Sequence, residues 1–209
     1  FSSNTFSGNA NAPMWIPFTN IGKVDSGSSF EDGSTVRVYG ASLSSDATVS
    51  ALDGDTPYRF SSTPEVDDAS LTIDPGVEMT FESDVAFWVN SGSAIIADGE
   101  ANDSSDPITM TATAGNEQQG WWRGVAIYSS NANNTFDYVE VRHAGSTDMS
   151  GISEAANVGV EAGAILNLTN STIADGAGYG VYLDNSNATL ASFSSNTFSG
   201  NANAPMWIP

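Results

Sequence analysis

Residues 171–198 read "STIADGAGYGVYLDNSNATLASFSSNTF" and contain the pattern that decides the fold. The stretch begins with Ser-Thr-Ile at 171–173 and ends with Asn-Thr-Phe at 196–198, so similar β-prone triplets recur after 198 − 173 = 25 residues. Two further β-prone runs lie between them, at 179–183 and 188–193, and each is followed by polar turn residues. Three short strands in one such period are typical of one coil of a three-sided solenoid.

Short β-prone runs closed by Gly, Asn, Asp or Pro also extend over much of the preceding chain, and they favour an all-β fold. They lie at 71–73, 79–81, 87–89, 94–96, 108–110, 125–127, 136–141 and 164–168. A further Asn-Thr-Phe at 134–136 precedes Ser-Thr-Ile by 173 − 136 = 37 residues, and we assign the additional residues to a loop at 146–157. A coil cannot bury its inward face alone, so coils stack, with Asn at corners bonding to the coils above and below and Gly supplying positive φ. We therefore expect an all-β fold, a right-handed parallel β-helix.

One seventeen-residue sequence, FSSNTFSGNANAPMWIP, occurs at 1–17 and again at 193–209, an offset of 193 − 1 = 192 residues. We interpret 1–17 as the last coil of a preceding identical module. Residues 18–55 are interpreted as an inter-module connection with short strands, and 56–209 as the β-helix coils, which end in the same coil as 1–17. A solenoid that ends without polar caps favours continuation into another module.

Composition narrows the classes of partner. The 209 residues include 25 Asp and Glu but only five Lys and Arg, a formal net charge of −20. Nucleic acids and anionic lipids need clustered basic residues, so neither is expected as a partner, whereas divalent cations are attracted. No apolar run approaches the roughly 20 residues of a membrane span, so no membrane insertion is expected. There is no cysteine, which excludes disulfides and thiolate chemistry.

Four segments carry a resemblance to a known family. They are LTIDPGVEMTF at 71–81, PITMTAT at 107–113, GWWRGVAIY at 120–128 and TFDYVEVRHAG at 135–145. In sequence and in order they resemble the right-handed parallel β-helix repeats of large secreted bacterial and archaeal surface proteins. The resemblance covers roughly residues 56–209 and implies this fold and an extracellular or cell-surface location. It implies no single reaction, because such proteins include stalks and adhesin segments, and others resemble polysaccharide lyases.

A catalytic constellation is not evident. The single histidine, His143, follows Glu140 and Arg142, and by alternation we expect these two to form an ion pair on one face with His143 on the other. No Gly-x-Ser-x-Gly nucleophile elbow is present, and with 25 acidic residues no pair of carboxylates stands out as acid and base. We therefore name no catalytic residue and expect a protein that is not an enzyme.

The segment DGEANDSSD at 98–106 is the candidate metal site. Its hard oxygen ligands suit calcium, the one cofactor that the sequence suggests; a solvated turn is the alternative. The candidate ligands are Asp98, Glu100, Asn102, Asp103 and Asp106.

Glycans are candidate partners in two ways. Five Asn-x-Ser/Thr sequons offer candidate glycosylation sites, at Asn102, Asn133, Asn167, Asn170 and Asn187. An outward tryptophan could stack on a sugar ring, but Trp121 and Trp122 lie in a segment that resembles a coil strand, so at least one is expected in the core.

The sequence leaves two functions open. The first is a structural module of a repetitive extracellular filament, stalk or surface layer, an adhesin-like rod that stacks end to end on copies of itself, head to tail, with a 192-residue period. The copies would be covalent tandem repeats or docked subunits. The alternative is a carbohydrate-binding or polysaccharide-degrading β-helix protein, which an outward row of tryptophans beside carboxylates would favour.

Overall fold

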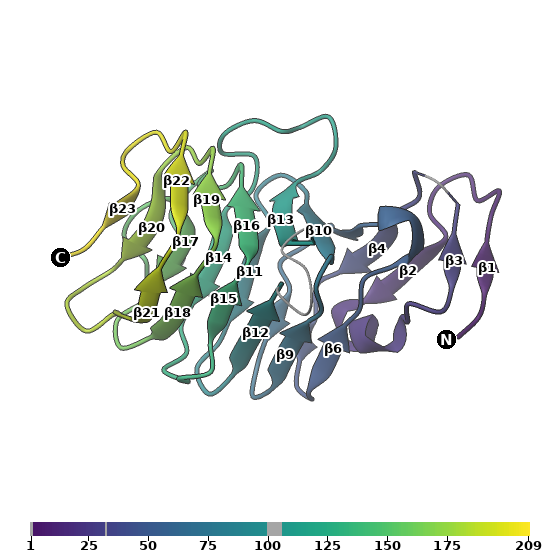
Figure 1. Ribbon diagram of the computed structural model, residues 1–209, viewed down its shortest axis with the longest axis horizontal. Helices are drawn as coiled ribbons and strands as arrows, with labels where there is room; N and C mark the ends of the chain where they lie inside the picture. The colour runs from purple at the N-terminus through teal and green to yellow at the C-terminus, as the bar shows by residue number, and fades with distance from the viewer. Residues whose placement is uncertain (1, 32, 100–105) are drawn as a thin grey trace.

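The computed structural model describes residues 2–31, 33–99 and 106–209, and its regular secondary structure consists almost wholly of parallel β-strands, which are wound into stacked coils (Figure 1). In one coil, β10 (Glu78–Phe81), β11 (Ala86–Val89) and β12 (Ala94–Asp98) each lie in a different sheet. The chain then returns to β13 (Ile108–Ala112), which pairs with β10 in parallel. The expected parallel β-helix is thereby confirmed.

Three parallel sheets form the sides of the stack in the described part of the chain, and we number them in the order in which a coil visits them. Sheet 1 contains β2 (Met14–Pro17), β4 (Val36–Tyr39), β7 (Tyr58–Phe60), β10, β13, β16 (Val139–Arg142), β19 (Thr172–Ala174) and β22 (Thr197–Ser199). Sheet 2 contains β5 (Ser42–Leu43), β8 (Glu65–Val66), β11, β14 (Gly124–Ile127), β17 (Ala156–Val160), β20 (Tyr179–Leu183) and β23 (Met206–Trp207). Sheet 3 contains β6 (Ala47–Val49), β9 (Ser70–Ile73), β12, β15 (Thr135–Asp137), β18 (Ile165–Thr169) and β21 (Thr189–Ser194).

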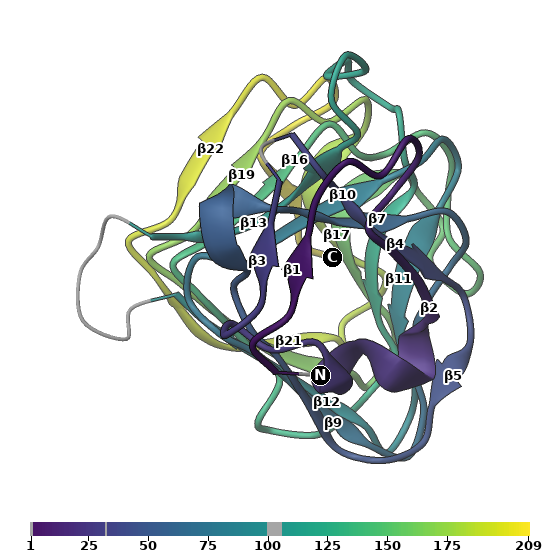
Figure 2. The same cartoon turned by 90° about the vertical axis from the view of Figure 1, so that its right-hand side faces the viewer.

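Further short elements lie near the N-terminal end of the stack. β1 (Thr5–Phe6) pairs in parallel with β3 (Ser29–Phe30), and the 3-10 helix η1 (Phe18–Lys23) packs beside β2, β4, β5 and β6. Viewed from this end, β1, β3 and η1 lie in front of the coils (Figure 2). A second 3-10 helix, η2 (Asp53–Asp55), connects β6 to β7. Among the described residues, no helix has the length and apolar character needed to cross a membrane.

The core is a column of apolar side chains along the axis of the stack. Every second strand residue points inward, and parallel register places inward residues of successive coils over one another. Val141 and Ile173, for example, are register partners and are both fully buried. The rings of Phe60 and Phe81 stack with centroids 5.1 Å apart, and those of Phe81 and Trp122 stack at 4.2 Å. Trp122 is therefore a core residue, as the sequence predicts.

Buried asparagines hold the corners of successive coils together. Asn134 is fully buried, and its Oδ1 accepts a hydrogen bond from the Ile95 N–H of the preceding coil at 3.0 Å. Its Nδ2 donates to the carbonyls of Ser129 and of Ile165, which belongs to the following coil. The expectation that corner asparagines bond to the coils on both sides is confirmed here.

One corner differs from the sequence prediction. The run at 136–141 was expected as one strand, but Tyr138 has a φ of +51° and divides it into β15 of sheet 3 and β16 of sheet 1. Phe136 consequently pairs with Leu168, whereas Ile173 pairs with Phe198. The 25-residue equivalence of 171–173 and 196–198 is confirmed, and the equivalence of 134–136 with them is wrong.

The coil stack also begins earlier than residue 56. Residues 18–55, interpreted from sequence as a connection with short strands, include β4, β5 and β6, which form a complete coil with one strand in each sheet. The short strands are present, but they belong to the β-helix. The loop expected at 146–157 lies between β16 and β17 and folds over the outer face of sheet 2, except that its last two residues belong to β17.

Candidate functional site: the open C-terminal end

The last coil of the chain exposes side chains that earlier coils bury. Phe193 of β21 is the register partner of fully buried Leu168, yet 45% of its surface is exposed. Phe198 of β22 and Met206 of β23 are only partly buried, although their register partners Ile173 and Val181 are fully buried. Within the described residues, no coil lies over these inward side chains. We call β21, β22 and β23 together the open end.

The backbone is open at the same place. β21, β22 and β23 are each the terminal strand of their sheet, so each is paired with a neighbouring strand on one side only. An unpaired strand edge offers N–H and C=O groups to any strand that can lie against it. The open end therefore combines apolar side chains with three strand edges that run in one direction.

The N-terminal end is covered, in contrast. Phe18 and Ile21 of η1 are fully buried, and the Phe18 ring makes edge contacts with Phe60 and Phe87 at 6.0 Å. Val24, which follows η1, is also buried. η1 thus closes the apolar column that the open end leaves uncovered.

The repeated seventeen-residue sequence lies at both ends and has different neighbours in each. Trp15 is in β2 of sheet 1, is 66% exposed, and makes an edge contact with Tyr39 at 6.0 Å. Its counterpart Trp207 is in β23 of sheet 2, is 45% exposed, and stacks on Tyr182 at 6.4 Å.

The candidate calcium site lies mostly outside the described residues. Glu100, Asn102 and Asp103 are not among them, and Asp98 and Asp106 are exposed residues on either side. In the described part of the chain, no group of three or more His, Cys, Asp or Glu residues could hold a metal ion. The calcium site therefore stays a prediction.

The sequons differ in how accessible their asparagines are. Asn133 and Asn187 lie exposed in turns, whereas the Asn167 amide donates to the carbonyls of Ala132 and Asn134. Asn170 is exposed, and its amide donates to Asp137 Oδ1 at 2.8 Å. Asn102 lies outside the described residues. Asn133 and Asn187 are thus the most accessible of the four described acceptors.

The charged residues around His143 form a structural cluster. Arg142 Nε lies 2.9 Å from Glu140 Oε2, which confirms the expected ion pair, and Arg142 Nη1 lies 3.2 Å from Asp175 Oδ2 in the next coil. These contacts raise the pKa of Arg142. The expectation that His143 faces the opposite side is wrong, because its φ of +63° breaks the alternation and its Nδ1 lies 2.8 Å from Thr111 Oγ1 on the outer face. Burial lowers the pKa of His143.

Aromatic side chains follow the outer face of sheet 2, but most of them are covered. Trp88 and Tyr128 meet edge to face at 6.2 Å beside the loop between β16 and β17. The loop inserts Met149 and Ile152, both buried, against this face. Trp207 is the substantially exposed ring of this face among the described residues, so an open aromatic row of the kind expected for a sugar platform is not formed.

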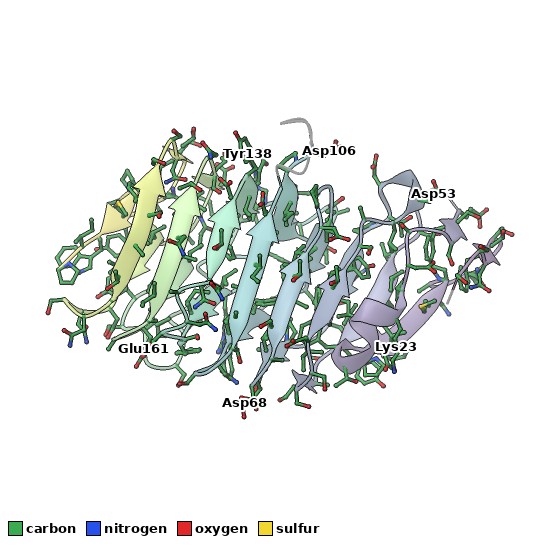
Figure 3. All side chains as sticks on the ribbon, turned by 60° about the horizontal axis from the view of Figure 1, so that its bottom comes forward. Lys23, Asp53, Asp68, Asp106, Tyr138 and Glu161 are labelled. Carbon is green, nitrogen blue, oxygen red and sulfur yellow. The ribbon has the colours of Figure 1, made fainter. Side chains whose placement is uncertain are left out.

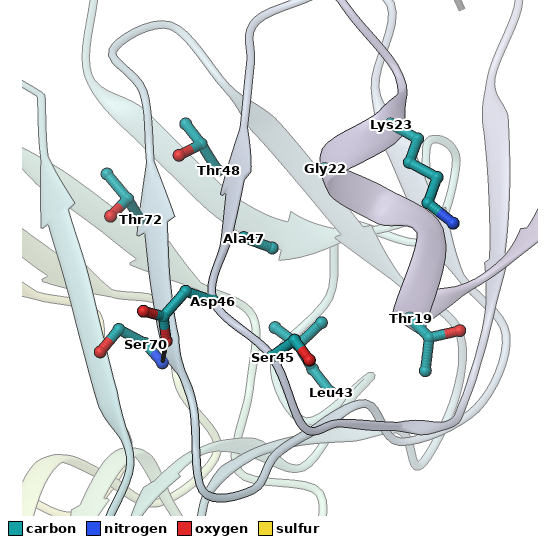
Figure 4. Close-up of a pocket in the computed structure, with 10 residues that line it drawn as sticks. All are labelled: Thr19, Gly22, Lys23, Leu43, Ser45, Asp46, Ala47, Thr48, Ser70 and Thr72. Atoms are coloured by element: carbon teal, nitrogen blue, oxygen red, sulfur yellow. Dashed lines mark hydrogen bonds between the residues drawn. The ribbon is translucent and has the colours of Figure 1, made fainter.

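A polar groove lies beside η1 at the outer face of sheet 3 and has a volume of about 630 Å³ (Figure 4). Thr48 and Thr72, which are register partners on β6 and β9, line it, together with Asp46 and Lys23. Asp46 Oδ1 accepts a hydrogen bond from Ser70 N–H at 2.8 Å. This groove was not predicted from the sequence. The signal for it is the threonine at the centre of 47–49 and of 71–73, which alternation turns outward in both strands.

Comparison with protein-family models, curated proteins and solved structures finds no match for this chain.

Proposed function

We propose that this chain is a structural module of a repetitive extracellular rod, part of a filament, stalk or surface layer, and that its modules stack end to end through the open end. The observation that carries the proposal is the exposure of Phe193 at a position that every earlier coil of the described residues buries. Burying apolar surface contributes about 25 cal/mol per Å², so a coil laid on the open end is stabilised. A second copy of this chain is the proposed occupant, because the sequence of the open end recurs at 1–17, where further residues pack on it.

The fold suits a load-bearing rod. The coils stack in a single line (Figure 1), so an added module lengthens the molecule without a new type of contact. Sideways association is opposed by the charge of −20. Acidic side chains lie at both ends of the strands of sheet 3, with Asp53 and Asp106 on the side of the carboxyl ends and Asp68 and Glu161 on the side of the amino ends (Figure 3). Growth is therefore favoured along the axis rather than across it.

The test is the mass of the native polypeptide after complete denaturation. A mass that is many times 21.7 kDa supports covalent tandem modules. A mass near 21.7 kDa, from material that is filamentous before denaturation, supports docked subunits. A mass near one module, from material that is a soluble monomer, overturns the proposal.

The groove beside η1 favours a second candidate, a carbohydrate-binding module. The side chains of Thr48, Thr72 and Asp46 line a polar groove, which suits the hydrogen bonding of a glycan. Titration of the chain with neutral and acidic oligosaccharides, monitored by NMR, tests this candidate. Chemical shift changes confined to the groove that disappear in Thr72→Val would support it, and their absence for all sugars would contradict it.

A further inference from the structure

The two copies of the repeated sequence have their strand partners on opposite sides. At the N-terminal end, Thr5 pairs with Ser29 and Met14 with Val36, so both partners follow the segment in the chain. At the open end, Thr197 pairs with Thr172. Met206 likewise pairs with Val181, so both partners there precede the segment. One copy of the segment can therefore bind both sets of partners at once, with a coil below it and a coil above it.

The copies also differ in the sheet that they occupy. Met14 and Trp15 lie in sheet 1, whereas Met206 and Trp207 lie in sheet 2. In the described structure, sheet 1 runs from β2 to β22 in seven steps from strand to strand, and β23 is the next strand after β22 along the coil. The repeat of 192 residues therefore spans seven and one third coils rather than a whole number.

We infer that consecutive modules share one copy of the segment and that each module is rotated by one sheet, a third of a turn, relative to the module before it. This inference rests on the proposed end-to-end stacking and specifies its geometry. After β23 the next module's η1 and β3 follow, and the next module's β4 extends sheet 2 of the first module. Three modules, 3 × 192 = 576 residues, restore the original orientation. At about 4.8 Å per coil, each module adds about 35 Å to the rod.

The contacts at the two ends complement each other in this junction. The shared tryptophan has Tyr182 on one side, as Trp207 shows, and Tyr39 on the other, as Trp15 shows. The shared phenylalanine, Phe6 in one copy and Phe198 in the other, stacks on Phe30 of the strand that follows the segment at 5.2 Å. Tyr182 precedes the segment in the chain and Tyr39 follows it, so both tyrosines can contact the shared tryptophan at once.

The rotation determines how the rod presents its surface. The groove beside η1 and the loop between β16 and β17 each appear on one face of a module and then on the next face in the following module. Any lateral partner of the rod would meet equivalent sites along a screw with three steps per turn.

The test uses a two-module chain of 209 + 192 = 401 residues, in which residues 18–209 are repeated once after residue 209. Because the sequence contains no cysteine, spin labels can be placed by single substitutions. One sample carries Tyr182→Cys in the first module and Arg37→Cys in the second. The matched control carries Thr172→Cys in the first module and the same Arg37→Cys in the second. With the rotation, the labels at Tyr182 and Arg37 lie two strands apart on sheet 2, and their backbone positions are about 10 Å from each other. The labels at Thr172 and Arg37 then lie on different sheets.

Continuous-wave EPR of both labelled chains distinguishes the outcomes. Dipolar broadening in the Tyr182 sample alone is the expected result. Broadening in the Thr172 sample alone, or in both, overturns the rotation but leaves end-to-end stacking in place. Broadening in neither sample overturns the shared junction.

A second measurement keeps the test independent of the labels and separates the inference from the proposed function. Phe193→Asp in the first module of the two-module chain is compared with the same substitution in the 209-residue chain. Stacking in any orientation buries Phe193, so the midpoint of denaturation of the first module should fall further in the longer chain. An equal fall in both chains would contradict stacking itself.

Discussion

Asn157 shows how single side chains connect the coils. It is fully buried between sheet 1 and sheet 2, and its Oδ1 accepts a hydrogen bond from Ala144 N–H at 2.9 Å. Its Nδ2 donates to the Ala174 carbonyl at 3.0 Å and to Asn201 Oδ1 at 2.8 Å in the last coil. A buried polar group needs every partner, because water cannot replace a lost one. One amide therefore connects three separate segments of the chain, two through backbone groups and one through the Asn201 side chain.

Asn157→Ala should lower the free energy of unfolding by about 1–3 kcal/mol, because it leaves the buried Ala144 N–H without its partner, while the Ala174 carbonyl keeps the hydrogen bond from the His143 N–H at 3.4 Å. Chemical denaturation measures the change. Asn133→Ala, at an exposed turn, is the control and should change stability by less than about 0.5 kcal/mol. Equal effects of the two substitutions would contradict the structural role of Asn157.

His143 should make stability depend on pH. Burial and the nearby Arg142 lower its pKa, while Asp175 and Glu117 oppose them. The unfolded chain then binds the proton more readily than the folded chain, so the His143 contribution to stability is present above about pH 6.5 and is lost as the pH falls through the lower folded value. Asn tolerates positive φ, so His143→Asn preserves the corner. The stability difference between wild type and His143→Asn should shrink between pH 7.5 and pH 5; an unchanged difference would refute this.

Among the strands, the three of the open end differ most from the others in solvent exposure. β21 is exposed along nearly its whole length, whereas β18, to which it is paired, buries Leu166 and Leu168. The inward positions of the two strands are equivalent, so the difference arises from the missing neighbour rather than from the composition of β21. An element with this property is stable only at the end of a stack or beneath another coil.

For modules that dock as separate subunits, Phe193→Asp in the 209-residue chain should weaken end-to-end association at least tenfold, because a carboxylate cannot be buried in an apolar junction without a partner. Ser194→Asp is the matched control, since it adds the same charge on the same strand at an outward position and should weaken association far less. Sedimentation equilibrium over a range of chain concentrations measures both. Association that is unaffected by Phe193→Asp would show that the open end is not the contact.

At the scale of the whole molecule, charge opposes compactness. The chain carries 25 acidic and five basic residues, and in the described residues Arg59 and Arg142 form three ion pairs. Exposed pairs of this kind contribute little, about 0–1 kcal/mol each. The remaining carboxylates repel one another, and salt screens that repulsion over about 10 Å at 0.1 M.

The melting temperature should therefore rise as NaCl increases from 10 mM to 1 M. A variant that carries Asp53→Asn, Asp68→Asn, Asp106→Asn and Glu161→Gln has a net charge of −20 + 4 = −16. These substitutions remove acidic groups at both ends of the strands of sheet 3. It should melt higher than wild type at 10 mM NaCl and respond less to salt. Calorimetry at each salt concentration measures how the melting temperature of wild type and of the variant depends on NaCl. An equal dependence in the two proteins would contradict charge repulsion as the cause.

The sequence by itself determined the fold class and most of the strands after residue 70, because both follow from local patterns. Alternating apolar residues in runs such as 71–73 and 179–183 and the turn residues between them specify short strands, and the 25-residue recurrence of 171–173 at 196–198 specifies their stacking. The ion pair of Glu140 with Arg142 was predictable for the same reason, since alternation places both on one face.

Only the tertiary structure decided which sheet each strand joins. A residue with positive φ such as Tyr138 turns the chain from one sheet to the next without any signal in the apolar pattern. The division of 136–141 into two strands could therefore not be predicted from the sequence. Identical residues at 1–17 and 193–209 likewise join different sheets. The number of strands between the two copies, and not their local sequence, determines which sheet each copy joins. The open end has the same origin: Phe193 is apolar in either setting, and its exposure depends on whether another coil lies above it.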